Sequence, residues 1–149
     1  MAYKYTQGNF KPQNPSKYRG DASGIVYRSG WELKLMLRLD SHQDIIWWQS
    51  EEMFIPYRSP VDNKIHRYFV DFLVRIKNKD GKEETLMIEV KPASQTHPPK
   101  RQSVATKKYI NEVFTWGVNS AKWKAAEEYC KDRGYKFCIF TEKELNIKF

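Results

Sequence analysis

The sequence predicts an α/β fold in which a mixed central β-sheet is flanked by helices. Two observations lead to this prediction. A meander of apolar strands joined by short turns fills the middle of the chain, between residues 45 and 91. Helical segments come before and after this meander, and one further strand lies near the end of the chain.

Length and composition describe one small basic domain. The chain has 149 residues, of which 40% are hydrophobic, which is enough for one core. Its formal net charge is +8 and its aromatic content is 15%. This balance favours a polyanionic partner, most often nucleic acid. No helix-turn-helix or zinc finger is visible, so we expect salt-sensitive binding of double-stranded DNA with little sequence preference.

Several patterns exclude other classes of protein. The two cysteines, Cys130 and Cys138, lack zinc-ligand spacing and are expected to be reduced core residues. His42, His66 and His97 show no metal-ligand spacing either. No apolar run approaches the ~20 residues of a membrane span, and no signal-peptide segment is present. We therefore expect an intracellular protein without a membrane partner.

The first elements are an arm and a helix. Residues 1–24 are polar and rich in lysine, proline and glycine, which predicts a basic arm before a domain over residues 25–149. The arm is either a frayed terminus or a segment that contacts DNA or a partner. Residues 30–40 alternate like a strand, but their composition and the Ser29–Glu32 capping-box spacing favour a helix.

The strands of the meander follow. Residues 45–48 and 52–57 are short apolar segments, and Pro56 makes the second an edge strand. A long strand is predicted over residues 66–76, then an Asp-Gly hairpin, then its antiparallel partner over residues 85–91. After a proline-rich loop at 92–102 we expect two helices, at about 103–115 and 120–133, with a stop at Gly134, a strand at 135–140 and a short helix at 141–145.

Charged residues interrupt the two hairpin strands. Alternate residues of a strand share a face, so Glu89 and Lys91 lie together, on the face opposite Leu86, Ile88 and Val90. Asp71 lies within the apolar segment "FVDFLV" of the neighbouring strand, on the face of Phe69 and Leu73. Tyr68 is expected on the other face. If Asp71 and Glu89 share a face, two carboxylates and a lysine converge on one spot.

Such a cluster suits a hard divalent cation. Carboxylate oxygens of Asp71 and Glu89, with the backbone carbonyl of Val90, match the ligands that Mg²⁺ prefers, and Mn²⁺ can take its place. A bound metal can activate water and polarise a phosphodiester. Lys91 would position that water or neutralise charge on the phosphate. A solvated Glu-x-Lys strand face is the alternative interpretation, but it does not explain the aspartate in "FVDFLV".

Glu32 is a third acid with two interpretations. It can be the capping-box glutamate of its own helix. It can also be a further ligand of the metal or its water, reaching from the helix that precedes the meander. The two roles can coexist.

These residues resemble a known signature. The set Glu32, Asp71 and "E89-V-K91" is similar to the PD-(D/E)xK nucleases, which share the restriction-endonuclease-like fold. The wider segments "KYRGDASGIVYRSGWE", "RYFVDF", "IEVKP" and "NEVFTWGVNSAKWKAAEEYCKDRGYKF" resemble the head completion nucleases of large contractile-tailed phages, from about residue 15 to 145. The end-cleaving subunits of Tn7-type transposons are a more distant likeness. Val70 stands where the superfamily name has proline, a common departure.

The resemblance implies a Mg²⁺-dependent deoxyribonuclease of phage morphogenesis, acting when filled heads join tails. Its catalytic residues would be Glu32, Asp71, Glu89 and Lys91. It would meet head or neck proteins of the portal region in the host cytoplasm, or remain with the virion. Endonuclease or exonuclease mode stays open, as does the oligomeric state, although a dimer would ease double-strand cuts. A basic DNA-binding adaptor at the head–tail junction and a transposon-end or junction-resolving endonuclease are the alternative functions.

Basic residues near these segments are candidates for phosphate contacts. The alternative for each is a solvated surface charge. The candidates are Arg19, Arg28, Lys100, Arg101, Lys107, Lys108, Lys122 and Lys124, of which Lys122 and Lys124 are expected to face outward.

Overall fold

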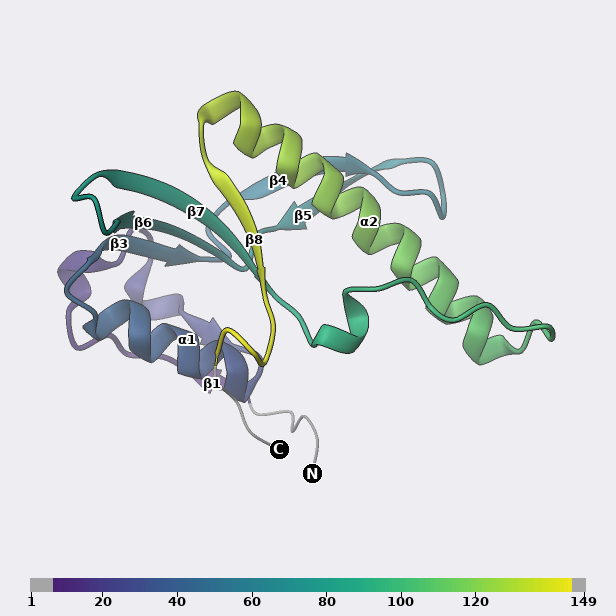
Figure 1. Ribbon diagram of the computed structural model, residues 1–149. Coiled ribbons are helices and arrows are strands. Elements are labelled where there is room, and N and C mark those ends of the chain that lie inside the picture. The colour runs from purple at the N-terminus through teal and green to yellow at the C-terminus, as the bar shows by residue number, and fades with distance from the viewer. Residues whose placement is uncertain (1–6, 146–149) are drawn as a thin grey trace.

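The computed structural model describes residues 7–145. Its centre is a four-stranded sheet in the order β3-β6-β7-β8. Helix α1 (Gly30–Ser41) covers one face, and helix α2 (Lys107–Arg133) lies over the other beside a separate hairpin (Figure 1). The strands of the main sheet are β3 (Ile45–Ser50), β6 (Phe72–Lys77), β7 (Glu83–Val90) and β8 (Lys136–Phe140).

Pairing in the main sheet is mixed, as predicted. Strand β6 pairs antiparallel with β3 and with β7, whereas β7 pairs parallel with β8. The tight turn between β6 and β7 contains Gly81 at φ 78°, a conformation that glycine adopts without strain. The predicted Asp-Gly hairpin is therefore confirmed, and it fixes the register in which Phe72 lies opposite Ile88.

Two apolar clusters fill the space on either side of this sheet. Leu35, Met36 and Leu39 of α1 pack with Trp48 and the α1-facing side chains of the sheet. On the other face, Ala126 and Cys130 of α2 pack with Met87, among others. Helix α1 itself is confirmed over the predicted residues, and the Ser29 hydroxyl accepts the Glu32 N–H at 3.2 Å.

The predicted long strand over residues 66–76 is wrong, because the chain changes sheets within it. Strand β5 (Ile65–Phe69) pairs with β4 (Phe54–Arg58) in its own two-stranded sheet, and β6 starts afresh at Phe72. Val70, between them, donates its N–H to the Met53 carbonyl at 3.2 Å. The Glu51 N–H lies 3.2 Å from the Val70 oxygen and 3.3 Å from the Asp71 oxygen. These bonds to the β3–β4 connection hold the break.

The two helices predicted at 103–115 and 120–133 are one helix of 27 residues, α2. Gly117 lies in its interior and not in a turn. Glycine costs a helix only about 1 kcal/mol, and here it lies against Pro60, whose Cγ is 3.5 Å from the place of a Gly117 Cβ. The Thr106 hydroxyl caps the helix start by accepting the Tyr109 N–H at 3.1 Å. Gly134, at φ 72°, ends the helix as predicted.

The segment after β8 forms a turn up to residue 145, where a short helix was predicted. Its capping bonds are nevertheless present. Glu144 Oε2 accepts the Thr141 hydroxyl at 2.6 Å and the Thr141 N–H at 3.2 Å. The remaining residues of the chain end lie outside the described part.

The described part of the N-terminal arm, residues 7–24, is mostly irregular, as predicted. It nevertheless packs on the domain. Phe10 and Tyr18 are buried, and their rings lie 5.8 Å and 4.7 Å from that of Trp48. Strand β1 (Gly8–Asn9) pairs with β2 (Val26–Tyr27) across the predicted boundary at residue 24, which stays a prediction. Short 3-10 turns occupy Pro15–Lys17, Ala22–Gly24 and, after β7, Ala93–Gln95.

Membrane-spanning helices and disulfide bonds can be examined among the described residues. Between residues 7 and 145, no helix is long and apolar enough to cross a membrane. Cys130 and Cys138 are free thiols, the first buried and the second partly buried.

Candidate active site

The break between β5 and β6 places Asp71 at the edge of the main sheet. Asp71 directly precedes Phe72, which lies opposite Ile88, so Asp71 comes opposite Glu89. Its Oδ2 accepts the N–H of Val90 at 2.9 Å, which ties the carboxylate to the end of β7. The predicted meeting of Asp71 and Glu89 on one face is therefore confirmed.

Glu89 is a buried carboxylate with one phenol partner. Only 5% of the residue is exposed, and the Tyr68 hydroxyl donates to Oε1 at 2.6 Å. Burial and the adjacent Glu89 raise the pKa of Tyr68, so its hydroxyl stays protonated and remains a donor. Burying a carboxylate without such a partner would be costly.

Tyr68 was predicted on the opposite face from Asp71, and this is wrong. Strict alternation from Tyr68 to Val74 assumed one continuous strand. Because the chain changes sheets at Val70, Tyr68 packs in the α2-facing cluster while Phe72 and Val74 pack in the α1-facing cluster. No local pattern in the sequence signals this change.

The acids at this edge repel one another. Burial raises the pKa of Asp71 well above its ordinary value, and the neighbouring Glu89 and Glu32 add to the rise. Burial also raises the pKa of Glu32, with Glu51 and Glu89 contributing. These mutual effects place Glu32, Asp71 and Glu89 within one electrostatic neighbourhood, where a cation would be stabilised.

Glu32 keeps its capping role. It is partly buried near the start of α1, and its Oε1 accepts the Arg28 N–H at 3.2 Å. The capping interpretation is therefore confirmed in substance. The influence of Glu32 on Asp71 is consistent with the second interpretation, a ligand of metal or water, which stays a prediction.

Lys91 continues the β7–β8 ladder through its N–H, which donates to the Phe140 carbonyl at 3.0 Å. Its side chain is partly buried and forms no hydrogen bond or ion pair with any residue in the range 7–145. Lys91 lies one residue beyond the end of β7, so its place on the face of Glu89, which alternation favours, stays a prediction. Its ammonium group has no partner among the described residues and so is free to meet a ligand.

The oxygen atoms of Asp71 and Glu89 fit a hard cation only if other ligands complete its coordination. Within the described residues, no three histidine, cysteine, aspartate or glutamate side chains converge tightly enough to hold a metal alone. Asp71 and Glu89, with the Val90 carbonyl, would leave the remaining positions to water or phosphate oxygens. Mg²⁺ sites usually keep several waters and few carboxylates, so the chemistry of these donors is compatible with Mg²⁺.

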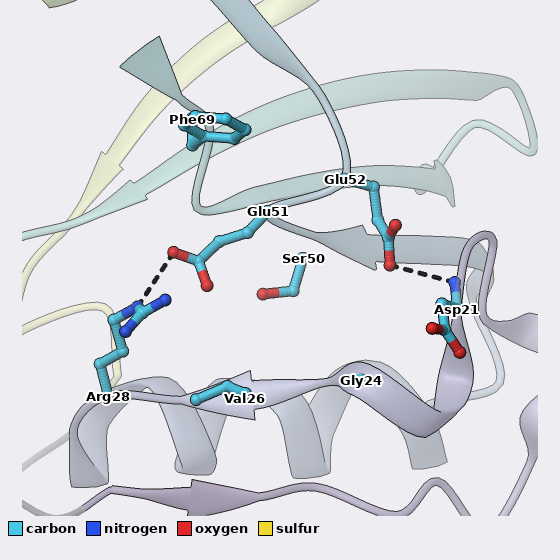
Figure 2. A pocket seen from close by; sticks show the side chains of 8 residues that line it. All are labelled: Asp21, Gly24, Val26, Arg28, Ser50, Glu51, Glu52 and Phe69. Atoms are coloured by element: carbon cyan, nitrogen blue, oxygen red, sulfur yellow. Dashed lines mark hydrogen bonds and ion pairs between the residues drawn. The ribbon is translucent and has the colours of Figure 1, made fainter. Parts of the chain in front are cut away.

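Glu51 is a further acid near Arg28 and Glu32 that the sequence analysis did not predict. It has a left-handed backbone, with φ 54°, and its Oε1 pairs with the Arg28 Nε at 3.1 Å. Figure 2 shows Glu51 reaching toward Arg28 across a cavity of about 460 Å³, with Phe69 on the same side as Glu51. Nothing in "SEE" at residues 50–52 signals this position. The cavity is lined by Asp21, Gly24, Val26, Arg28, Ser50, Glu51, Glu52 and Phe69.

The predicted phosphate-binding residues do not form one cluster. Arg28 lines the cavity, and Arg19 lies over the Trp47 ring at 4.7 Å. Lys122 does not face outward as predicted, because its Nζ lies 5.7 Å from the Tyr68 ring and 5.8 Å from the Tyr57 ring. Lys124 is exposed, as are Lys100, Arg101, Lys107 and Lys108 around the start of α2.

Comparison with known proteins decides the family. The family model described as "TnsA-like endonuclease N terminal" matches residues 42–142, two thirds of the chain and the part that holds Asp71, Glu89 and Lys91. The chain belongs to the TnsA-like endonuclease family.

The TnsA-like chain is also 42% identical to the head completion nuclease of Enterobacteria phage T4. The similarity extends over 97% of this chain and 95% of the relative. The predicted restriction-endonuclease-like fold is confirmed, and both predicted resemblances are borne out. The edge of β6 and β7 is therefore the candidate active site of a nuclease.

Proposed function

We propose that this chain is a Mg²⁺-dependent DNA endonuclease that acts in phage head completion, when filled heads join tails. The observation that carries the proposal is the convergence of Asp71 and Glu89 beside the unpaired Lys91. The similarity to a head completion nuclease supports the biological setting.

The residues have distinct parts in the proposed hydrolysis. Asp71, Glu89 and the Val90 carbonyl would hold the cation, and Glu32 would hold it directly or through water. The bound metal would supply a Lewis acid for the phosphodiester and a more acidic water. Water oxygen forms the new bond to phosphorus, and the bond to one sugar oxygen breaks. Lys91 would orient this water or stabilise the charge that develops on the phosphate oxygens.

The crowding of acidic side chains at the site favours the binding of a cation. Raised pKa values at Asp71 and Glu32 reflect carboxyl groups that burial and their neighbours disfavour as anions. A dication stabilises the ionised forms, so metal binding and deprotonation are coupled. The Val90 N–H and the Tyr68 hydroxyl hold the two carboxyl groups in place before the metal arrives.

The chain would bind double-stranded DNA mainly through phosphates. Its charge of +8 favours nonspecific, salt-dependent contact. Arg28, which lines the cavity beside Glu51, is one of the proposed phosphate contacts. Portal-region head or neck proteins are the proposed protein partners, met in the host cytoplasm during assembly.

Cleavage of supercoiled plasmid tests the proposal. Purified protein is incubated with Mg²⁺, Mn²⁺ or EDTA, beside an Asp71→Asn variant. We expect nicked and linear DNA with either metal, and none with EDTA or with the variant. Absence of cleavage by the wild type with every divalent metal, while DNA binding persists, would instead support a non-enzymatic DNA-binding adaptor.

A further inference from the structure

The β4–β5 hairpin has one buried and one exposed face. Ile55, Tyr57 and Tyr68 point inward and pack with residues of α2. The outward face is formed by three cross-strand pairs. These pairs are Phe54–Phe69, Pro56–Arg67 and Arg58–Ile65, and all six residues are exposed.

The outward face is aromatic and cationic. Phe54 is 45% exposed and Phe69 is 48% exposed, although their ring centroids lie only 5.6 Å apart. The Arg67 guanidinium carbon lies 5.0 Å from the Phe54 ring centroid. None of the six outward residues carries a carboxylate. A ligand that offers flat rings and negative charge matches such a surface.

The Phe69 end of this face leads along the chain to the candidate active site. Phe69 lines the same cavity as Arg28 and Glu51, and Figure 2 shows its ring on the Glu51 side of that space. Asp71 follows two residues later. The preceding residue of the same strand, Tyr68, points inward to Glu89. A strand of DNA at the catalytic edge could therefore continue onto the two phenylalanines.

We propose that Phe54 and Phe69 stack on unpaired bases of a DNA strand beside its scissile phosphodiester, with Arg67 contacting the adjacent phosphates. The substrate class is then DNA with a single-stranded segment, such as an overhang, flap or gap. This inference rests on the proposed nuclease function and refines its substrate. Bases in an intact duplex have both faces covered by neighbouring pairs, so exposed rings favour unpaired bases.

Charge argues against a second copy of the chain as the occupant. The outward face carries Arg58 and Arg67 without a compensating acid, and the chain as a whole has a charge of +8. Two such faces in contact would repel each other. DNA supplies the negative charge that this face lacks.

Binding measured without cleavage tests the inference. All variants are made in a Lys91→Ala chain, and fluorescence anisotropy compares a single-stranded oligonucleotide with a blunt duplex of equal length. We expect Phe54→Ala/Phe69→Ala to bind the single strand about 10-fold more weakly, with less than about a two-fold change for the duplex. With Phe54 and Phe69 present, binding should quench the fluorescence of a 2-aminopurine base in the oligonucleotide, and the double alanine variant should lose this quenching. Phe114→Ala, which truncates an equally exposed phenylalanine on α2, is the matched control.

The outcomes separate this inference from the nuclease proposal. Phe54→Tyr/Phe69→Tyr keeps the rings and should restore single-strand binding and quenching. Unchanged single-strand affinity in the alanine variant, or equal losses for both DNAs, would overturn the stacking role. Because no cleavage is needed, selective single-strand binding would uphold the surface even if the wild-type chain proved inactive on every DNA, a result that would contradict the nuclease alone.

Discussion

The Tyr68 hydroxyl donates a 2.6 Å hydrogen bond to Glu89 Oε1, and the two residues come from different sheets. Tyr68 belongs to the β4–β5 hairpin, whereas Glu89 lies on the central sheet next to Asp71. The break at Val70 is what brings them together. The candidate catalytic edge therefore depends on a contact between the two sheets.

Removing this hydroxyl tests whether it holds Glu89 in place for the proposed metal. We expect Tyr68→Phe to weaken Mn²⁺ binding about 10-fold, because partners of metal ligands typically contribute 10- to 100-fold. Isothermal titration calorimetry measures the binding directly, and plasmid cleavage across Mn²⁺ concentrations measures its consequence. Tyr57→Phe is the control, since the Tyr57 hydroxyl makes no hydrogen bond with the described residues. Equal Mn²⁺ affinity in both variants would show that the bond only supports the fold.

Stability of the metal-free protein should fall as pH rises. The pKa of Asp71 is raised in the folded state, so the folded protein holds a proton that the unfolded chain releases near the ordinary value of 3.8. Its relative stabilisation is complete below that pH and is lost as pH rises through the raised pKa. Urea unfolding in EDTA at several pH values should show a larger loss in the wild type than in Asp71→Asn, which keeps only the contribution of Glu32. Added Mg²⁺ should restore stability at the higher pH values in the wild type alone.

Phe10 should be as important to the fold as residues of the main domain. Its side chain is 7% exposed and lies against Trp48. We expect Phe10→Ala to lower the free energy of unfolding by about 3–5 kcal/mol, whereas Lys11→Ala, at an exposed neighbour, should have little effect. Chemical denaturation measures both. A near-neutral Phe10→Ala would support a separate arm with its boundary at residue 24.

A substitution at Gly117 tests whether α2 is one continuous helix or two helices joined by a bend. In a continuous helix, Gly117→Ala should stabilise the protein by about 0.5–1 kcal/mol, because alanine favours a helix interior more than glycine does. The new Cβ would meet Pro60 at an ordinary 3.5 Å and would not clash. Gly81→Ala should destabilise it, since the residue lies at φ 78°. Thermal unfolding of both variants gives the signs. Destabilisation by Gly117→Ala would indicate a bend that needs glycine.

Local patterns predicted much of the site correctly. The Ser29–Glu32 spacing identified the start of α1, and the Asp80–Gly81 turn set the hairpin that brings Asp71 opposite Glu89. Both inferences succeeded because each depends on contacts between residues close in sequence or across one tight turn. Alternation along β7 also predicts Lys91 beside Glu89, one residue beyond the end of the strand.

The missed features depend on distant contacts. The break at Val70 arises from backbone bonds to Glu51 and Met53, and it reversed the predicted side of Tyr68. The same connection positions Glu51 beside Arg28. Gly117 lies inside the continuous helix α2, at a position next to Pro60. No periodicity within these segments carries that information.

The single-turnover rate of DNA cleavage by Lys91→Ala tests the central claim most directly. Lys79→Ala, which removes an exposed lysine at the far end of the β6–β7 hairpin, is the matched control. We predict at least about a 100-fold lower rate for Lys91→Ala, with DNA binding retained and with the control equal to the wild type. A Lys91→Ala protein that cleaves DNA at the wild-type rate would contradict a catalytic site formed by Asp71, Glu89 and Lys91.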